Sequence, residues 1–323
     1  MVGTGTLVRA IRFAAPRLGQ LVVVVLAVTL LFYWMLSLLP GNPCVLTLSG
    51  AATQEQIDEC ERDRNLDQPV IVQWAKWGAD IFTGDFGKSY NTGLTFSESF
   101  TNALPRTLLL MVYSQVLALG VAIPLGVWSG YRQGSVGDKV TSGGAFLLLS
   151  IPVFALSLIL ILVFAVKLDW FDLSGYEPLS QGLGAHFRVM FLPSIALAAG
   201  LLPVYLRLLR TDVIGTLQED FVGTARAKGL PTHMILGRHV LRPSSFTLLT
   251  VFGIQAAQAL NGAIVVEFIF DLDGLGSLLV GWVAAREYLL VQTLVALIAV
   301  AFVTINTLVD LLYSALDPRV RRK

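Results

Sequence analysis

The residues best suited to chemistry lie in one polar stretch, from Glu219 to Pro243, between two long apolar segments. Acidic side chains come early in this stretch and basic side chains late, which is the order that a helix dipole favours. Its basic residues are Arg226, Lys228, Arg238 and Arg242, and His239 is a possible fifth charge. A stretch of this composition is suited to binding a partner.

Helix signals divide the polar stretch in two. Helix-forming residues predict a first helix from Asp212 to Gly229, and the final glycine and Pro231 form a stop. Thr232 is suited to cap a second helix from His233 to Leu241, which we expect to end at Pro243. A unit of this shape binds either anionic lipid or a groove in another protein.

Charge density separates these two partners. Lipid-binding segments carry denser clusters of about 4–8 basic residues. Here the basic residues are interrupted by small ones that allow close backbone approach, namely Gly223, Thr224, Ala225 and Ala227. The pattern therefore favours a protein groove.

No catalytic chemistry is indicated. The sequence lacks the GxxxxGK[ST], HExxH, GxSxG and CxxC motifs. Its histidines, His186, His233 and His239, are scattered, so we expect neither a metal site nor a cofactor. A net charge of +1 argues against a nucleic-acid partner. We therefore expect that the chain is not itself an enzyme.

A second group of polar residues lies inside apolar segments. Gln255, Gln258 and Asn261 recur at helical spacing and predict one polar stripe, with Glu267 near its end. Amides hydrogen-bond a peptide-like solute without fixing its charge, so we assign these four residues and Tyr113 to a translocation path. Hydrogen bonding between packed helices is an equal alternative for the stripe.

Composition indicates a membrane protein, because 55% of the residues are hydrophobic, 14% are charged and the mean hydropathy is +0.71. Six stretches reach the length of about 20 residues that a span needs. They are Leu18–Leu39, Thr107–Trp128, Gly143–Val166, Met190–Leu209, Ser245–Phe270 and Leu289–Leu316. The first is too long for a cleavable signal. Prolines inside spans, Pro124, Pro152 and Pro203, predict kinks.

Lys and Arg residues in the loops place both termini, and the polar stretch, in the cytoplasm. The longest outer segment, from Gly41 to Pro105, then predicts a small external subdomain, in which Thr53 opens an N-capped helix. It holds both cysteines, Cys44 and Cys60. An oxidising outer face allows a disulfide, worth about 3 kcal/mol in the loop-entropy model, and two buried thiols are the alternative.

The last outer loop carries Asp271 and Asp273, and we place both carboxylates at an external mouth. The apolar run that follows, Leu278–Ala285, is too short to span a bilayer. It predicts an interfacial or re-entrant helix.

Short motifs along almost the whole chain resemble those of one family. TARAKGL at Thr224–Leu230 is followed by HVLR at His239–Arg242. The others are LLPGNP at Leu38–Pro43, LDQPVIVQW at Leu66–Trp74, GDFGKS at Gly84–Ser89, AIPLGV at Ala122–Val127, EFIFDLDGLG at Glu267–Gly276 and NTLVDLLYSALDPRVR at Asn306–Arg321. Together, and in this order, they resemble the membrane-spanning subunits of bacterial ABC importers for dipeptides and oligopeptides.

This resemblance implies an all-α permease with six transmembrane helices and the type I ABC importer architecture, in the bacterial plasma (inner) membrane. The implied partners are a second permease, two cytoplasmic ATPase subunits or one fused ATPase chain, an external solute-binding protein, a peptide substrate and membrane lipid. The chain then divides into a cytoplasmic N-terminus with the first span (1–40), an external subdomain (41–105), a five-helix core (106–316) with a coupling loop (212–243), and a basic tail (317–323).

In that family the loop forms a coupling helix seated in a groove of the ATPase. The resemblance assigns this contact to Glu219, Asp220, Gly223, Thr224, Ala225, Arg226, Ala227, Lys228, Gly229, His239 and Arg242. The sequence departs from the pattern at Gly223, where the broader importer signature has Glu, and at Pro243, where the family commonly has Asn.

Three other functions are open on the sequence alone. Relatives with the same cytoplasmic motifs import nickel chelates or glycosides. A proton-coupled peptide carrier is disfavoured because the middle of the spans has no carboxylate. A non-transporting scaffold is disfavoured because the coupling signature is intact.

Overall fold

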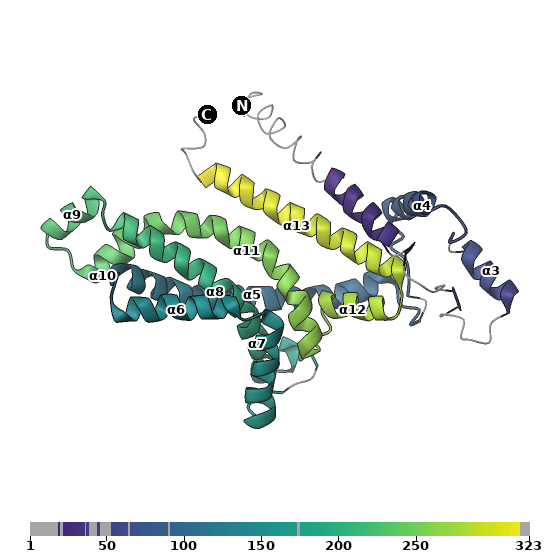
Figure 1. Cartoon of the computed structure of the whole chain (residues 1–323), viewed down its shortest axis with the longest axis horizontal. Helices are drawn as coiled ribbons and strands as arrows, with labels where there is room; N and C mark the ends of the chain where they lie inside the picture. The colour runs from purple at the N-terminus through teal and green to yellow at the C-terminus, as the bar shows by residue number, and fades with distance from the viewer. Residues whose placement is uncertain are drawn as a thin grey trace. The chain divides into compact units, whose positions relative to one another are not determined.

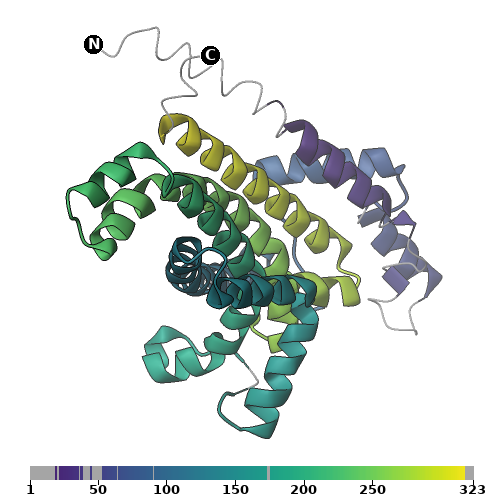
Figure 2. The ribbon, with the colours of Figure 1, turned by 60° about the vertical axis from the view of Figure 1, so that its left-hand side comes forward.

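The computed structural model describes residues 19, 22–35, 37–38, 44–45, 53–63, 65–89, 91–172 and 175–316, without the side chains of Asp63, Phe246 and residues 308–316. The described residues are nearly all helical, as the all-α prediction requires (Figures 1 and 2). They form two compact units. Unit 1 takes the described residues of Met1–Ala103 and Leu278–Thr307, and unit 2 those of Leu104–Ser277 and Leu308–Lys323.

Several helices are long and apolar enough to cross a membrane, which confirms a multi-pass protein. Among the described residues they are α5 (Phe96–Tyr131), α8 (Leu183–Thr216), Thr247–Phe270 of α11 (Leu241–Phe270) and Tyr288–Thr307 of α13 (Tyr288–Leu316). The bent pair Val136–Ser150 and Val153–Lys167 adds a fifth span if it counts as one. Of the predicted span Leu18–Leu39, the apolar helix Val22–Met35 is described and several flanking residues are not. The count of six stays a prediction.

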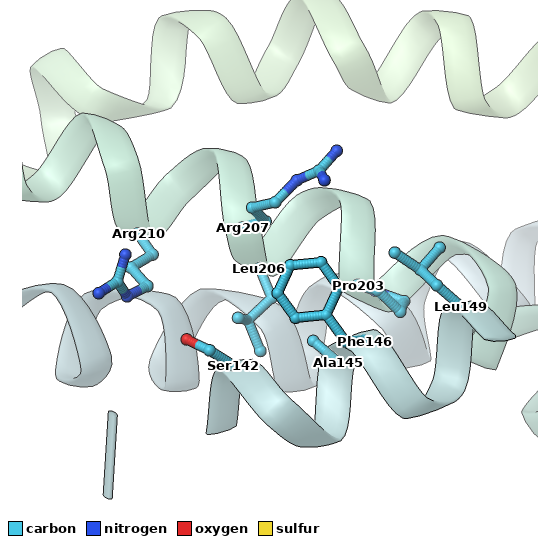
Figure 3. A pocket seen from close by; sticks show the side chains of 8 residues that line it. All are labelled: Ser142, Ala145, Phe146, Leu149, Pro203, Leu206, Arg207 and Arg210. Carbon is cyan, nitrogen blue, oxygen red and sulfur yellow. The ribbon is translucent and has the colours of Figure 1, made fainter. Parts of the chain in front are cut away.

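In unit 2, α8 is the central helix. It packs against α6 (Val136–Ser150), α7 (Val153–Leu160) and α11. Most of its side chains from Val189 to Val213 are buried, as expected for a helix that is apolar on every side. A pocket of about 310 Å³ lies between α6 and α8 (Figure 3). It is lined by Ser142, Ala145, Phe146 and Leu149 of α6 and by Pro203, Leu206, Arg207 and Arg210 of α8.

The kink predicted at Pro152 is confirmed, and it is large. The helices on either side of it are bent by 100°. Ile151 adopts an extended backbone, with φ −91° and ψ 118°, because proline disfavours the helical conformation in the preceding residue. Pro124 and Pro203 lie inside α5 and α8, which continue past them, and the kinks predicted there stay predictions. Beyond α7 come a π-helical segment, η1 (Ile161–Lys167), and a 3₁₀ turn, η2 (Leu179–Gln181).

The helix predicted from Asp212 to Gly229 is wrong, because α8 ends at Thr216 and a separate helix, α9 (Asp220–Ala227), follows. Hydrogen bonds with three-residue spacing tighten the turn between them: Gln218 donates to the Gly215 carbonyl at 3.1 Å, and Glu219 to that of Thr216 at 3.2 Å.

The expected helix end at Pro243 is also wrong. α10 (Thr232–Met234) and a π-helical segment, η3 (Ile235–Val240), lead without a break into α11. The Leu241 N–H donates to the Leu236 carbonyl, five residues back. This wider turn stands just before Pro243, which lies in the first turn of α11 and has no N–H to donate.

Unit 1 contains the helix Val22–Met35, α3 (Gln54–Asp63), α4 (Val70–Thr83), the start of α5, most of α12 (Leu275–Ala284) and α13 as far as Thr307. The predicted cap of α3 is confirmed, because the Gln56 N–H donates to the Thr53 hydroxyl at 3.4 Å and the Thr53 N–H donates to the Gln56 side chain at 3.0 Å. The short helix predicted at Leu278–Ala285 is α12, which begins three residues earlier.

The GDFGKS motif forms a turn that Glu287 holds. Gly84 ends α4 in the left-handed region, with φ +88°. The buried Glu287 carboxylate accepts hydrogen bonds from the Ser89 hydroxyl at 2.7 Å and from both the backbone and the side-chain amide of Asn91 at 3.0 and 2.9 Å. The motif therefore has a structural role, and no local pattern in the sequence indicated its distant partner.

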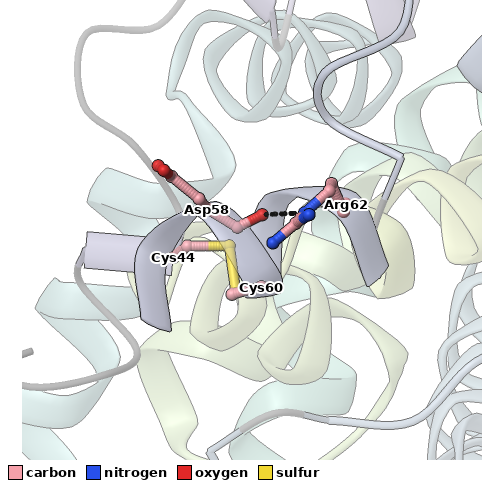
Figure 4. The surroundings of a disulfide bond; sticks show 4 residues. All are labelled: Cys44, Asp58, Cys60 and Arg62. Atoms are coloured by element: carbon pink, nitrogen blue, oxygen red, sulfur yellow. Dashed lines mark hydrogen bonds between the residues drawn. A yellow bond between two sulfur atoms is a disulfide. The ribbon is translucent and has the colours of Figure 1, made fainter. Parts of the chain in front are cut away.

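Cys44 and Cys60 are joined in a disulfide, with their Cα atoms 5.9 Å apart (Figure 4). Beside it, the Arg62 Nε donates to the Asp58 carbonyl at 3.2 Å within α3. The bridge ties α3 to a segment 16 residues earlier in the chain.

The disulfide gives a testable expectation. Purified protein should not react with a maleimide until it is reduced, and should then gain two reactive thiols. The double variant Cys44→Ser/Cys60→Ser should lose about 3 kcal/mol of stability in this segment, because the unfolded chain regains its loop entropy. Protease digestion of that variant, with unreduced wild-type protein as the reference, measures the loss. Labelling of unreduced protein would contradict the bridge.

Candidate functional site

The polar stretch folds into a helical hairpin, which we define as residues 217–243 and call the polar hairpin. Its residues 217–240 project beyond the ends of α8 and α11 (Figures 1 and 2). α9 packs against η3, and the side chains of Val222, Ala225, Ile235 and Val240 are buried. At its base, the hydroxyls of Thr216 and Ser244 share a hydrogen bond of 3.1 Å. The hairpin therefore has its own small core and a closed base.

The predicted stop at Gly229 is confirmed. Gly229 has φ +75°, and its N–H donates to the Arg226 carbonyl at 2.9 Å. The Leu230 N–H donates to the Ala225 carbonyl at 3.3 Å. These two bonds form a Schellman motif, in which a left-handed residue turns the chain away from the helix end. A Cβ at Gly229 would meet nothing within 4 Å, so only the backbone conformation requires glycine here.

Most residues assigned to the partner contact are exposed on the polar hairpin. They are Glu219, Asp220, Gly223, Thr224, Arg226, Ala227, Lys228, Gly229 and Arg242. Ala225 is buried in the hairpin and His239 is half-buried, so these two side chains are less accessible to a partner than the others. Among the described residues, Arg226, Lys228 and Arg242 form no ion pair.

Two apolar residues of the hairpin were missed. The Phe221 side chain is 46% exposed and that of Met234 is 39% exposed, on the same projecting unit. Large apolar side chains in contact with solvent are suited to a protein groove. The signal was present in the sequence, because Phe221 is a large apolar residue among charged and small ones in a segment predicted to be helical.

Of the three amides in the polar stripe predicted on α11, two are exposed and one is buried. Gln255 is buried, whereas Gln258 and Asn261 are exposed. Exposed residues recur along α11 at spacings of four and three, namely Ile254, Gln258, Asn261, Val265 and Phe268. The two amides thus lie in the middle of one exposed, otherwise apolar face.

Tyr113 belongs to an aromatic cluster. Its hydroxyl lies 3.0 Å from Nε2 of the buried His186, whose Nδ1 lies 2.6 Å from the Glu177 carbonyl. A carbonyl only accepts, so Nδ1 donates to it, and in the neutral ring Nε2 accepts from Tyr113. The rings of Tyr176 and Phe187 contact the same histidine.

Glu267 holds the loop between α11 and α12. The fully buried carboxylate accepts a hydrogen bond from the Gly276 N–H at 2.7 Å. A Cβ at Gly274 would lie 2.3 Å from the carboxylate, and one at Gly276 would lie 2.3 Å from the Ile264 Cα. Both glycines are therefore required by close approach.

Residues at the start of unit 2 fix the other side of this loop. The Leu275 N–H donates to the Thr107 hydroxyl at 2.9 Å. Arg106 pairs with Asp273 at 3.1 Å and lies 4.8 Å from the centre of the Tyr176 ring. Asp271 and Asp273 are both exposed and adopt left-handed backbone, with φ +53° and +48°. We call Arg106, Thr107, Glu267, Asp273, Gly274 and Gly276 the loop clasp.

The described residues hold no group of three or more His, Cys, Asp or Glu side chains that could bind a metal ion. The three histidines lie in different surroundings. His186 is buried in the aromatic cluster, His233 is exposed on the polar hairpin, and His239 is half-buried within the hairpin.

Two family models match the sequence. Residues 122–322 match the model described as binding-protein-dependent transport system inner membrane component. Residues 10–111 match the model for the N-terminal part of such membrane components.

Curated relatives match over more than nine-tenths of the chain. The chain is 32% identical over 305 residues to the probable peptide ABC transporter permease protein y4tP of Sinorhizobium fredii, covering 94% of this chain and 97% of the relative. It is 34% identical over 300 residues to the oligopeptide transport system permease protein AppB of Bacillus subtilis, covering 92% and 95%. It is 32% identical over 313 residues to the glutathione transport system permease protein GsiC of Salmonella choleraesuis, covering 97% and 100%.

A solved structure shares the fold. A chain of the MetNI methionine ABC transporter, in inward-facing conformations, matches with a TM-score of 0.56 and 15% sequence identity. The match covers 68% of this chain and 96% of that chain.

Proposed function

This chain belongs to the family of binding-protein-dependent transport system inner membrane components and is a permease component of an ABC importer, and we propose that its solutes are short peptides. In this proposal the peptides move into the cytoplasm by alternating access, driven by ATP hydrolysis in partner subunits. The observation that carries the choice of solute is the similarity, over more than nine-tenths of the chain, to permeases named for peptides, oligopeptides and glutathione. No P-loop motif occurs in the sequence, so a partner must supply the ATPase.

The polar hairpin is the part suited to receive that energy. It projects from two long helices, has a closed base, and exposes Phe221 beside Gly223 and Arg226. In this proposal it seats in a groove of a cytoplasmic ATPase subunit, with both chain termini on the same side of the membrane. A substrate-binding protein on the outer side delivers the peptide, and a second permease completes the passage.

The exposed face of α11 is suited to line that passage. Gln258 and Asn261 each offer donors and acceptors that match a peptide backbone. Exposing amides to lipid is costly, so a face with two of them favours contact with a wet path or a second permease. Gln255, Glu267 and Tyr113 lie off this face and would act through packing.

The amides give a direct prediction. Gln258→Leu and Asn261→Leu should each lower peptide uptake about fivefold, because a lost hydrogen bond costs about 1 kcal/mol. Ile254→Leu, on the same face, is the matched control and should transport normally. Uptake by reconstituted complex measures the effect. Full activity in both leucine variants would assign the amides to packing alone.

A reconstitution experiment tests the proposed function. The chain, purified with its co-expressed partners, is placed in vesicles, and uptake of labelled peptide is measured with ATP inside and, separately, with a proton gradient. ATP-dependent uptake that requires the binding protein is expected. Uptake driven by the gradient alone would overturn the proposal. Competition by a nickel chelate or a glycoside, without competition by unlabelled peptide, would show that the transported solute is not a peptide.

A further inference from the structure

A buried carboxylate joins three helices next to the polar hairpin. Asp138, in the first turn of α6, is 3% exposed. It accepts two hydrogen bonds from the Arg210 guanidinium of α8, at 2.6 and 2.8 Å. It also accepts from the Ser129 hydroxyl near the end of α5 at 2.5 Å and from the Gly134 N–H at 2.8 Å. Neither Asp138 nor Arg210 belongs to the contact assigned to the hairpin.

The same region holds α5 against α8 at backbone distance. A Cβ at Gly130 would lie 2.7 Å from the Val213 side chain and 3.0 Å from the Arg210 carbonyl. One at Gly126 would lie 3.2 Å from the Leu209 side chain. Two glycines four residues apart are the spacing that allows close helix packing in membranes. Helix α5 therefore cannot shift across α8 at this point without a steric clash.

Packing between α6 and α8 leaves a void. The 310 Å³ pocket opens between these two helices, and Arg210 lies at one end of its lining (Figure 3). A void removes the van der Waals contacts that would otherwise hold the helices in register. The two-point contact of Arg210 with Asp138 is therefore a tether between α6 and α8 beside the pocket.

Position along the chain connects this tether to the hairpin. Arg210 lies six residues before the end of α8 at Thr216, where the hydrogen bond to Ser244 closes the base of the hairpin. A helix transmits displacement along its axis. A second helix packed beside it moves with it only if contacts fix the two helices together. The tether supplies this fixation for α6, and the glycine contacts supply it for α5.

We propose that Asp138 and Arg210 are positioning residues that pass movement of the polar hairpin from α8 to α6 and α5. The proposal rests on the proposed docking of the hairpin to an ATPase. Breaking the pair leaves the hairpin intact, since no residue of 217–243 takes part in it. ATP hydrolysis then continues while the spans follow it poorly.

The test measures peptide uptake and ATP hydrolysis in the same vesicles. Asp138→Asn and Arg210→Gln each leave one charge without its partner, so the double variant, which removes both charges, guards against misfolding. Arg210→Lys keeps the charge and loses the two-point contact. Arg207→Gln, three residues earlier on α8 and exposed, is the matched control.

In the double variant, uptake per ATP hydrolysed should fall about fivefold or more, as expected when a coupling free energy is lost. Binding of the ATPase subunits should be unchanged. Arg210→Lys should give an intermediate ratio of uptake to ATP hydrolysed, and Arg207→Gln should give the wild-type ratio. If the pair were merely structural, its loss would lower peptide uptake and ATP hydrolysis together. Either that result, or a wild-type ratio of uptake to hydrolysis in a folded variant, overturns the inference. Failure of the wild-type complex to use ATP would instead refute the proposed function.

Discussion

Replacing Gly229 by valine should weaken transport about tenfold while leaving membrane insertion normal. Gly229 has φ +75° at the end of α9, a conformation that costs an L-residue roughly 1–2 kcal/mol, and a β-branched side chain suffers most. The strain would break the Schellman motif and move the chain that links α9 to η3. ATP hydrolysis by the assembled complex should fall with uptake, because the hairpin itself is displaced.

Two further substitutions distinguish the backbone conformation that Gly229 allows from a contact between this position and a partner. Asparagine tolerates the left-handed region, so Gly229→Asn should keep most of the activity. Aspartate has the same shape with a negative charge, and the site is open for 4 Å around the Cβ position. Gly229→Asp should therefore fold like the asparagine variant and lose activity only if a partner contacts this point. The measurement is peptide uptake and ATP hydrolysis by reconstituted complex, and valine activity equal to that of asparagine would contradict the conformational argument.

Gly229 also shows why some features could be predicted from the sequence. A glycine followed by Pro231 limits the local backbone whatever surrounds it, and the stop was found where expected. The same holds for the cap of α3 at Thr53, and for the short helix α12, whose length alone rules out a span. The bend at Pro152 was predictable in place, although its angle of 100° was not.

Features that depend on distant partners were missed. The continuation of α11 through Pro243 needs the wider turn of η3, which no local signal indicates. Gln255 has the same helical spacing as Gln258 but is buried, because neighbouring helices cover that side of α11. Asp138 and Arg210 are 72 residues apart, so their pairing follows from the packing of α6 on α8.

The loop clasp carries the second large effect, at Gly276. A Cβ there would lie 2.3 Å from the Ile264 Cα and 2.7 Å from its carbonyl oxygen, so backbone must move to admit even alanine. Gly276→Ala should push the start of α12 away from α11 and break the bond from the Gly276 N–H to Glu267. Overpacking costs about 1–3 kcal/mol, and a buried carboxylate that loses a donor adds to it.

The matched control lies on the same helix. A Cβ at Gly281 would meet nothing within 4 Å, and alanine in a helix is favoured over glycine by about 1 kcal/mol. Gly276→Ala should therefore lower the thermal unfolding temperature of the purified complex and abolish most peptide uptake, whereas Gly281→Ala should leave both unchanged or raise the temperature slightly. Glu267→Gln, which keeps an acceptor for the Gly276 N–H, should fall between them. Equal stability of the two alanine variants would show that the loop between α11 and α12 can move freely, and the Glu267 carboxylate would then be free to line the translocation path.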